Sequence, residues 1–224
     1  MRLAVATLRT SVLGFAAMAI LIVLPAWSLN YWQGWVFIAV FAIATNLIGV
    51  YLALKDPVLL ERRKRFGPGA ESRGVQKMIA WLAIFGSAAM LVVCALDYRF
   101  GWSRVPPLIS LLGDMLVVLG LLVDWFVLRE NSFGSSTIEA VEGQKVISTG
   151  PYALVRHPMY VGVLIMLIGV PPAPGSWWGL LFLLLFVPAL VWRILDEEEL
   201  LKRDLTGYAD YLRTVRHRLV PGFW

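Results

Sequence analysis

Residues 150–178 read GPYALVRHPMYVGVLIMLIGVPPAPGSWW, in which a short apolar run lies between a polar entry and a proline-rich exit. Proline is favoured in the first turn of a helix and pushes the preceding residue out of the helical region, so we expect an extended His157 and a helix that begins at Pro158. A helix from 158 to 170 rises only about 20 Å, whereas a bilayer core is roughly 30 Å thick. The prolines and glycine of residues 171–176 then force a turn. The stretch therefore predicts a tight helical hairpin with a short first arm.

The composition of the whole chain predicts that this hairpin lies in a membrane. Of the 224 residues, 59% are hydrophobic and 16% are charged, whereas soluble domains are roughly 25% charged. Several uncharged apolar runs reach the roughly 20 residues that a helix needs to cross a bilayer core. The short alternating strands of a membrane barrel are absent from the sequence pattern. We expect an all-α integral membrane protein, with N-terminal transmembrane helices over 1–128 and a functional unit over 129–224. Its six hydrophobic segments cover residues 11–27, 32–54, 77–97, 106–129, 159–170 and 176–193.

The distribution of positive charge predicts the orientation in the membrane. Loop 55–76 carries six basic residues, and the connection near 28–31 carries none. Because cytoplasmic loops are enriched in lysine and arginine, we expect loop 55–76, loop 130–158 and both termini in the cytoplasm of a bacterial cell, with the protein in its inner membrane. The basic residues flank hydrophobic runs, so the net charge of +5 does not indicate a nucleic-acid partner. The N-terminal run lacks a clean small-x-small cleavage site, so we interpret it as a retained first helix.

Metal and disulfide chemistry have little support in the sequence. Cys94 is the only cysteine, which excludes a disulfide within the chain and a cysteine-based metal site. Its apolar neighbours predict a buried, inert thiol. The sequence has no HExxH motif and no glycine-rich dinucleotide loop after a strand, so we expect neither a metal site nor a soluble-type cofactor fold.

The start of the predicted helix at Pro158 is a candidate anion site. Backbone amides in the first turn, around 159–161, would be free and would be reinforced by the helix dipole, and Arg156 would add a fixed cation. Tyr152 and Tyr160 offer aromatic faces to a planar ring or a cation. In the alternative interpretation, Arg156 and His157 mark the membrane boundary and the two tyrosines belong to the interfacial aromatic belt.

A second cluster follows the last hydrophobic segment in the stretch RILDEEELLKRDLTGYADYL. On a continued helix, Arg193 and Glu197 share one face with Leu200, Leu201, Asp204, Tyr208 and Tyr211. Acid-before-base spacing predicts solvated pairs of Glu198 with Lys202 and of Glu199 with Arg203. Glu197 has no such exposed partner, so we expect it to turn inward and pair with Arg193.

The stretches GPYALVRHPMYVG and RILDEEELLKRDLTGYADYLRTVRHRLVPGFW resemble the C-terminal half of the isoprenylcysteine carboxyl methyltransferase family, which comprises integral membrane enzymes. The resemblance covers about residues 129–224 and implies S-adenosylmethionine as cofactor, in a cytosolic pocket roofed by loop 130–158 and the C-terminal helix. It assigns cofactor binding to Tyr152, His157, Pro158, Tyr160, Glu197 and Glu198. It places Arg156 and Arg193 at the reacting groups, so that the expected catalytic residues are Arg156, Arg193 and Glu197.

The expected function is methyl transfer at the membrane to a lipidic or prenylated acceptor. Such a displacement needs no metal, because alignment of donor and acceptor supplies most of the acceleration. Carboxyl methylation is favoured, since an ionised carboxylate can be held by an arginine and needs no base. An amine acceptor, as in phospholipid N-methylation, would need Glu197 or His157 as base. Two alternatives are a sterol-type membrane reductase, which resembles this chain in an arginine–histidine–proline–x–tyrosine element and uses NADPH, and a non-enzymatic membrane scaffold.

Overall fold

A computed structural model describes residues 2–139 and 143–224, and its regular elements are all helices, with no strand among the described residues. The expected all-α class is confirmed. In chain order the elements are α1 (Arg2–Ala26), α2 (Trp32–Lys55), α3 (Pro57–Lys64), α4 (Gly74–Phe100), α5 (Pro107–Glu130), η1 (Gly150–Ala153), α6 (Pro158–Gly169), η2 (Trp178–Phe182), α7 (Leu183–Asp204) and α8 (Tyr208–Thr214).

Four helical stretches are long and apolar enough to cross a membrane: α2, α4, α5 and the continuous run Trp178–Asp204 formed by η2 and α7. Two further apolar helical stretches are α6 and Ser11–Ala26, which is part of α1. Each of the six hydrophobic segments of the sequence therefore overlaps one of these helical stretches. The predicted boundary at residue 128 falls near the end of α5.

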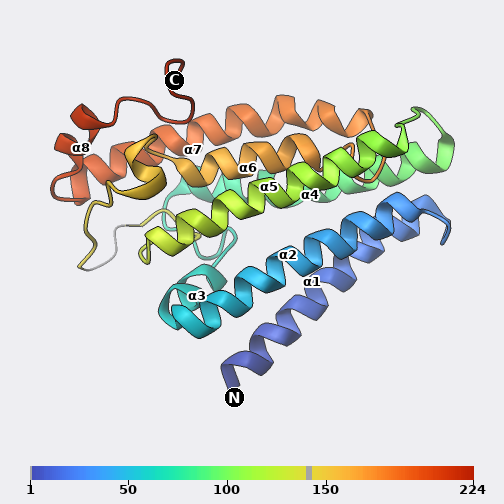
Figure 1. Ribbon diagram of the computed structural model, residues 1–224, viewed down its shortest axis with the longest axis horizontal. Helices are drawn as coiled ribbons and strands as arrows, with labels where there is room; N and C mark the ends of the chain where they lie inside the picture. The colour runs from blue at the N-terminus through green and yellow to red at the C-terminus, as the bar shows by residue number, and fades with distance from the viewer. Residues whose placement is uncertain (1, 140–142) are drawn as a thin grey trace.

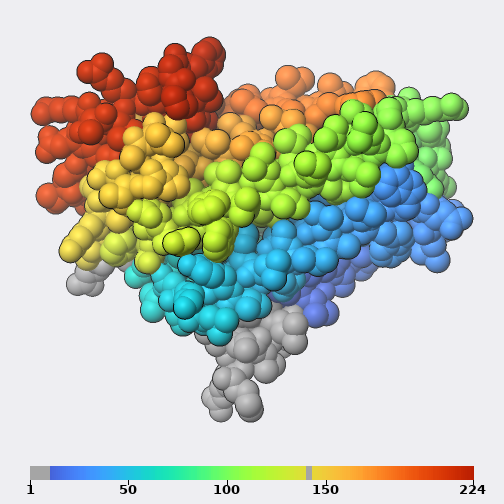
Figure 2. Space-filling model, viewed as in Figure 1, coloured from blue at the N-terminus to red at the C-terminus, as the bar shows by residue number. Residues whose placement is uncertain are grey.

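The helices form an elongated bundle whose two ends differ (Figure 1). The long helices α4, α5 and α7 run along the bundle axis together with the shorter α6, and α2 lies against α5 while α1 contacts α2 and α4. The short connections gather at one end. At the other end lie α3, the segments 131–139 and 143–157, and α8, and Figure 2 shows the C-terminal residues covering this end of α7. The charged stretches of the sequence are thus collected on one side of the apolar bundle.

The short-loop end is held by buried polar contacts around a hydrophobic core. The Tyr31 hydroxyl donates to the Pro174 carbonyl at 2.5 Å, and the Ser176 hydroxyl donates to Asp97 at the same distance. These bonds tie the proline-rich turn to α4 and to the connection before α2. Cys94 is fully buried in this core, as expected from its neighbours.

The short helix α6 packs mainly against α5, backbone against backbone. A Cβ atom on Gly120 would lie 2.5 Å from the Gly162 carbonyl oxygen, and one on Gly169 would lie 2.6 Å from the Gly113 carbonyl oxygen. Small residues at a helix contact allow such a close approach in membranes. The chain does reverse after α6 as predicted, but the principal partner of the first arm is α5 and not the second arm of the hairpin.

The acidic helix ends earlier than the sequence pattern predicts. α7 stops at Asp204, and Gly207 adopts a left-handed conformation with φ of 86° before α8 begins. A residue without a Cβ adopts this conformation at no steric cost. The expectation that Tyr208 and Tyr211 continue the face of Arg193 and Glu197 on one helix is therefore wrong. They return toward that face from a separate helix.

The orientation predicted from charge can be tested with single cysteines in a Cys94→Ser background. Ser72 and Ser148 lie at the charged end of the bundle and Asn30 lies at the other, and all three are exposed. An impermeant thiol reagent added outside intact cells should label Asn30→Cys and leave Ser72→Cys and Ser148→Cys unlabelled until the cells are opened. External labelling of Ser148→Cys would contradict a cytoplasmic position of the charged end.

Candidate functional site

A cavity of about 880 Å³, including its open mouth, lies at the charged end of the bundle. Its wall comes from residues 131–139, 144–147, the η1–α6 junction and the ends of α7 and α8. Six of the eight residues that the resemblance assigned to catalysis or cofactor binding line it: Tyr152, Arg156, His157, Pro158, Tyr160 and Glu197. Glu198 and Arg193 are not part of the lining and lie behind it.

The segment before α6 is held extended by the C-terminal part of the chain. The amides of Arg156 and His157 donate to the carbonyls of His217 and Arg218 at 2.9 and 3.0 Å. Pro158 begins α6, as predicted, whereas His157 is outside the helix but not fully extended, with φ of −125° and ψ of 61°. The proline thus sets the direction of the helix, while the 217–218 segment fixes the two charged residues before it.

The predicted anion site at the start of α6 is largely closed. The amides of Tyr160 and Val161 both donate to the His157 carbonyl, at 3.1 and 3.4 Å. Arg156 is not a free cation either, since its side chain is 8% exposed and its Nε lies 3.1 Å from Glu198. The expectation of free amides beside an unpaired arginine is therefore wrong, because the first turn already uses the amides of Tyr160 and Val161 and the arginine is ion-paired with Glu198.

Glu198 is a buried anchor for three cationic or polar side chains. Its side chain is 2% exposed, and it lies 3.3 Å from His157 Nε2 and 3.0 Å from Arg218 Nη2 in addition to its contact with Arg156. The predicted solvated pair with Lys202 is wrong. Arg218, which the sequence analysis did not single out, lies 20 residues further along the chain, and no local spacing rule connects it to Glu198.

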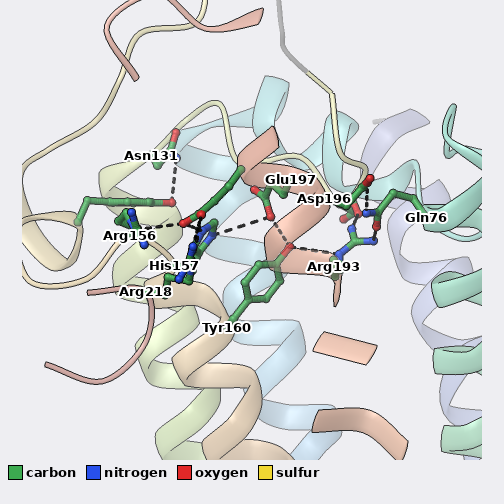
Figure 3. Close-up of polar contacts among 12 residues, drawn as sticks. Gln76, Asn131, Arg156, His157, Tyr160, Arg193, Asp196, Glu197 and Arg218 are labelled. Atoms are coloured by element: carbon green, nitrogen blue, oxygen red, sulfur yellow. Dashed lines mark hydrogen bonds and ion pairs between the residues drawn. The ribbon is translucent and has the colours of Figure 1, made fainter. Parts of the chain in front are cut away.

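Glu197 lines the cavity. Its carboxylate accepts a hydrogen bond from Tyr160 (Figure 3). The Tyr160 hydroxyl donates to Glu197 Oε2 at 2.6 Å, and His157 Nδ1 lies 3.9 Å from the same carboxylate. Arg193 Nε donates to the Tyr160 hydroxyl at 3.2 Å. The expected pairing of Glu197 with Arg193 is thus indirect, since the tyrosine lies between them.

Arg193 is engaged by the N-terminal half of the chain. Its Nη1 donates to Glu71 at 3.1 Å and to Gln76 at 2.7 Å, and its Nη2 donates to the Ser136 carbonyl at 3.0 Å. Gln76 also donates to Asp196, which is bonded to Arg73. Sequence reasoning missed Glu71, Gln76 and Asp196. Asp196 is three positions after Arg193, a spacing that places both side chains on one helix face. No local sequence pattern indicates the partners of Arg193 that are more than 100 residues away.

Tyrosines form the rest of the polar wall. The Tyr152 hydroxyl accepts from Asn131 at 2.9 Å, and the Tyr211 hydroxyl donates to the Tyr152 carbonyl at 2.7 Å. Burial raises the pKa of Tyr152 to about 12 and raises the pKa values of Tyr208 and Tyr211 further above their usual range. All three hydroxyls therefore remain protonated and can act as donors at neutral pH. Tyr208, 4% exposed, has no hydrogen-bond partner for its hydroxyl among the described residues.

Fold and site together describe an all-helical protein with four helices able to span a membrane and a charged, tyrosine-lined cavity at one end. The family model of phospholipid methyltransferases matches residues 108–205, a span that includes α5 to α7. This family of membrane methyltransferases is related to the isoprenylcysteine carboxyl methyltransferases. The chain is also similar to the Delta(14)-sterol reductase of Mus musculus, with 30% identity over 91 residues, which is 39% of this chain and 22% of the reductase.

Proposed function

We propose that the protein is an S-adenosylmethionine-dependent methyltransferase that acts on a lipidic acceptor at the membrane surface. The observation that carries this proposal is the state of Glu197. Of the four carboxylates in the polar network, Glu71, Asp196 and Glu198 each bond to an arginine. Among the described residues Glu197 bonds to no arginine or lysine, and it is the member of this group that lines the cavity. A carboxylate left without a fixed cation suits a ligand that brings its own positive charge.

The donor set of the cavity fits this cofactor. Tyr152, His157 and Tyr160 provide aromatic faces, and Glu197 provides a negative charge, as a sulfonium requires. S-adenosylmethionine would supply an electrophilic methyl group that leaves its sulfur in a single displacement. Pro158 would shape the floor of the site, and Glu198 would act from behind by holding Arg156 and His157 in place. The contribution of the chain is alignment and exclusion of water.

The contacts of the two arginines bear on the identity of the acceptor. Arg193 is bonded to Glu71, Gln76 and the Ser136 carbonyl, and Arg156 is paired with Glu198. Arg193 is therefore not a free fork for an acceptor carboxylate. A lipid amine would instead need a group that accepts its proton, and Glu197 is placed in the cavity for that role. We therefore favour a lipid amine over the carboxylate favoured on sequence grounds, in keeping with the family match to phospholipid methyltransferases.

Thermal stability of the detergent-solubilised protein tests the cofactor. A ligand that binds only the folded state raises the apparent Tm by mass action. At a concentration 100 times its Kd, such a ligand should raise the free energy of unfolding by about 2.7 kcal/mol. We expect S-adenosylmethionine and S-adenosylhomocysteine to raise Tm, and NADPH and NADH to leave it unchanged. Stabilisation by the nicotinamides alone would overturn the methyltransferase proposal.

A membrane reductase is the second candidate, and it is favoured by the similarity to the sterol reductase. The matched segment covers only 22% of that protein, and the carboxylate at the cavity wall would repel the 2′-phosphate of NADPH. The same thermal experiment separates the two candidates, since each predicts stabilisation by a different pair of ligands.

A further inference from the structure

Glu71 joins three separate parts of the chain behind the cavity. It lies in the loop between α3 and α4, its side chain is 3% exposed, and it is outside the residues matched by the family model. Its Oε1 accepts from Arg193 on α7 at 3.1 Å, and its Oε2 accepts from the Ile138 amide at 3.1 Å. A single buried carboxylate therefore connects the N-terminal half to α7 and to the segment that precedes η1.

The segment 136–138 is held by the Glu71–Arg193 pair through its backbone. Glu71 accepts a hydrogen bond from the Ile138 amide, and Arg193 Nη2 donates to the Ser136 carbonyl at 3.0 Å. Thr137 and Ile138 are buried and line the cavity. Because one partner binds an amide and the other a carbonyl two residues away, the ion pair fixes both the position and the direction of this wall.

The same ion pair reaches Glu197 on the opposite side. Arg193 Nε donates to the Tyr160 hydroxyl, which in turn donates to Glu197. A tyrosine hydroxyl has one proton, so a donor bonded to its oxygen leaves that proton free to point at the carboxylate. Glu71 holds Arg193 and thereby helps to set the direction in which Tyr160 donates. Figure 3 shows the two hydrogen bonds that connect Arg193, Tyr160 and Glu197.

We propose that Glu71 is a positioning residue of the cavity: it fixes the wall 136–138 and, through Arg193, the orientation of Tyr160 against Glu197. The cofactor readout of this inference rests on the proposed methyltransferase function. The consequence is that the N-terminal half of the chain completes a site whose other residues lie mainly within the family match.

The test compares Glu71→Ala and Glu71→Gln with Glu61→Gln, a matched change in α3, where the Glu61 side chain is 58% exposed and pairs with Lys64. Binding of S-adenosylhomocysteine is measured by calorimetry well below the Tm, where a purely structural effect would leave the affinity of the folded protein unchanged. We expect Glu71→Ala to weaken binding about tenfold and Glu71→Gln, which keeps one acceptor, about threefold. Glu61→Gln should bind as the wild type does.

Hydrogen exchange at the Ile138 amide, measured without ligand, provides an independent readout. We expect faster exchange in Glu71→Ala than in the wild type and in Glu61→Gln, because the acceptor of this amide is removed. Unchanged exchange at Ile138, or an affinity loss equal to that of Glu61→Gln, would overturn the positioning role. A wild type that does not bind S-adenosylhomocysteine would refute the proposed function, while the exchange experiment would still decide the role of Glu71. If Glu71→Ala does not fold, the same two measurements on the isosteric Glu71→Gln test the positioning role of Glu71.

Discussion

Replacement of Glu197 by glutamine should weaken the binding of S-adenosylmethionine by about ten- to a hundredfold. The change keeps the shape of the side chain and an acceptor for the Tyr160 hydroxyl, but it removes the charge that faces the cavity. Charge-assisted contacts contribute roughly 1.5–3 kcal/mol, which corresponds to this range of affinities. Calorimetric titration of the purified variant measures the effect directly.

The neighbouring Glu199→Gln variant is the matched control for Glu197. Glu199 is 80% exposed, and its nearest cation is Arg73 at 4.0 Å, a contact of the kind that contributes little. Its affinity for the cofactor should stay near that of the wild type. S-adenosylhomocysteine lacks the sulfonium charge, so Glu197→Gln should weaken it less than S-adenosylmethionine. Equal losses for the two ligands would instead indicate that Glu197 holds the ribose hydroxyls, and no loss in either variant would remove Glu197 from the site.

Replacement of Gly120 by alanine should destabilise the protein, whereas the same change at Gly49 should not. The new Cβ would lie 2.5 Å from the Gly162 carbonyl oxygen and 2.8 Å from the Met166 amide nitrogen. Both are backbone atoms, so the clash can be relieved only if α5 and α6 move apart. Overpacking of this kind costs about 1–3 kcal/mol, which for a chain of this size lowers Tm by roughly 2–12 °C. A thermal unfolding curve in detergent measures it.

Gly49→Ala in α2 provides the control, because a Cβ at this position meets nothing within 4 Å. Alanine is the better helix former, so its Tm should be unchanged or slightly higher. If both variants unfold at the same temperature, α5 and α6 do not meet backbone to backbone in the folded protein.

Local rules were enough to predict the helical class and the local backbone around α6. The start of α6 at Pro158, the non-helical backbone of His157 and the turn over residues 171–176 follow from backbone restrictions of proline and glycine, which act within one or two residues. Six residues that the sequence analysis placed in one site lie around one cavity, namely Tyr152, Arg156, His157, Pro158, Tyr160 and Glu197.

Spacing failed where two interpretations of the same helix were equally good. Glu198 with Lys202 has the spacing of a solvated pair, yet Glu198 is buried against Arg156, His157 and Arg218. Helical periodicity says which residues share a face, but not which face is covered by chain that returns from elsewhere. The end of α7 at Asp204 was missed for a related reason, because the pattern continues while the glycine at 207 turns the backbone.

The sequence by itself thus determined a bundle of apolar helices, a short helix that begins at Pro158 and a set of charged and aromatic residues near the membrane boundary. Only the tertiary structure decided which carboxylate faces the cavity and which are neutralised by arginine. The physical reason is that the partners of Arg193 and Glu198, such as Glu71 and Arg218, come from distant segments. Ion pairs between such segments depend on the packing of whole helices, which no local propensity encodes.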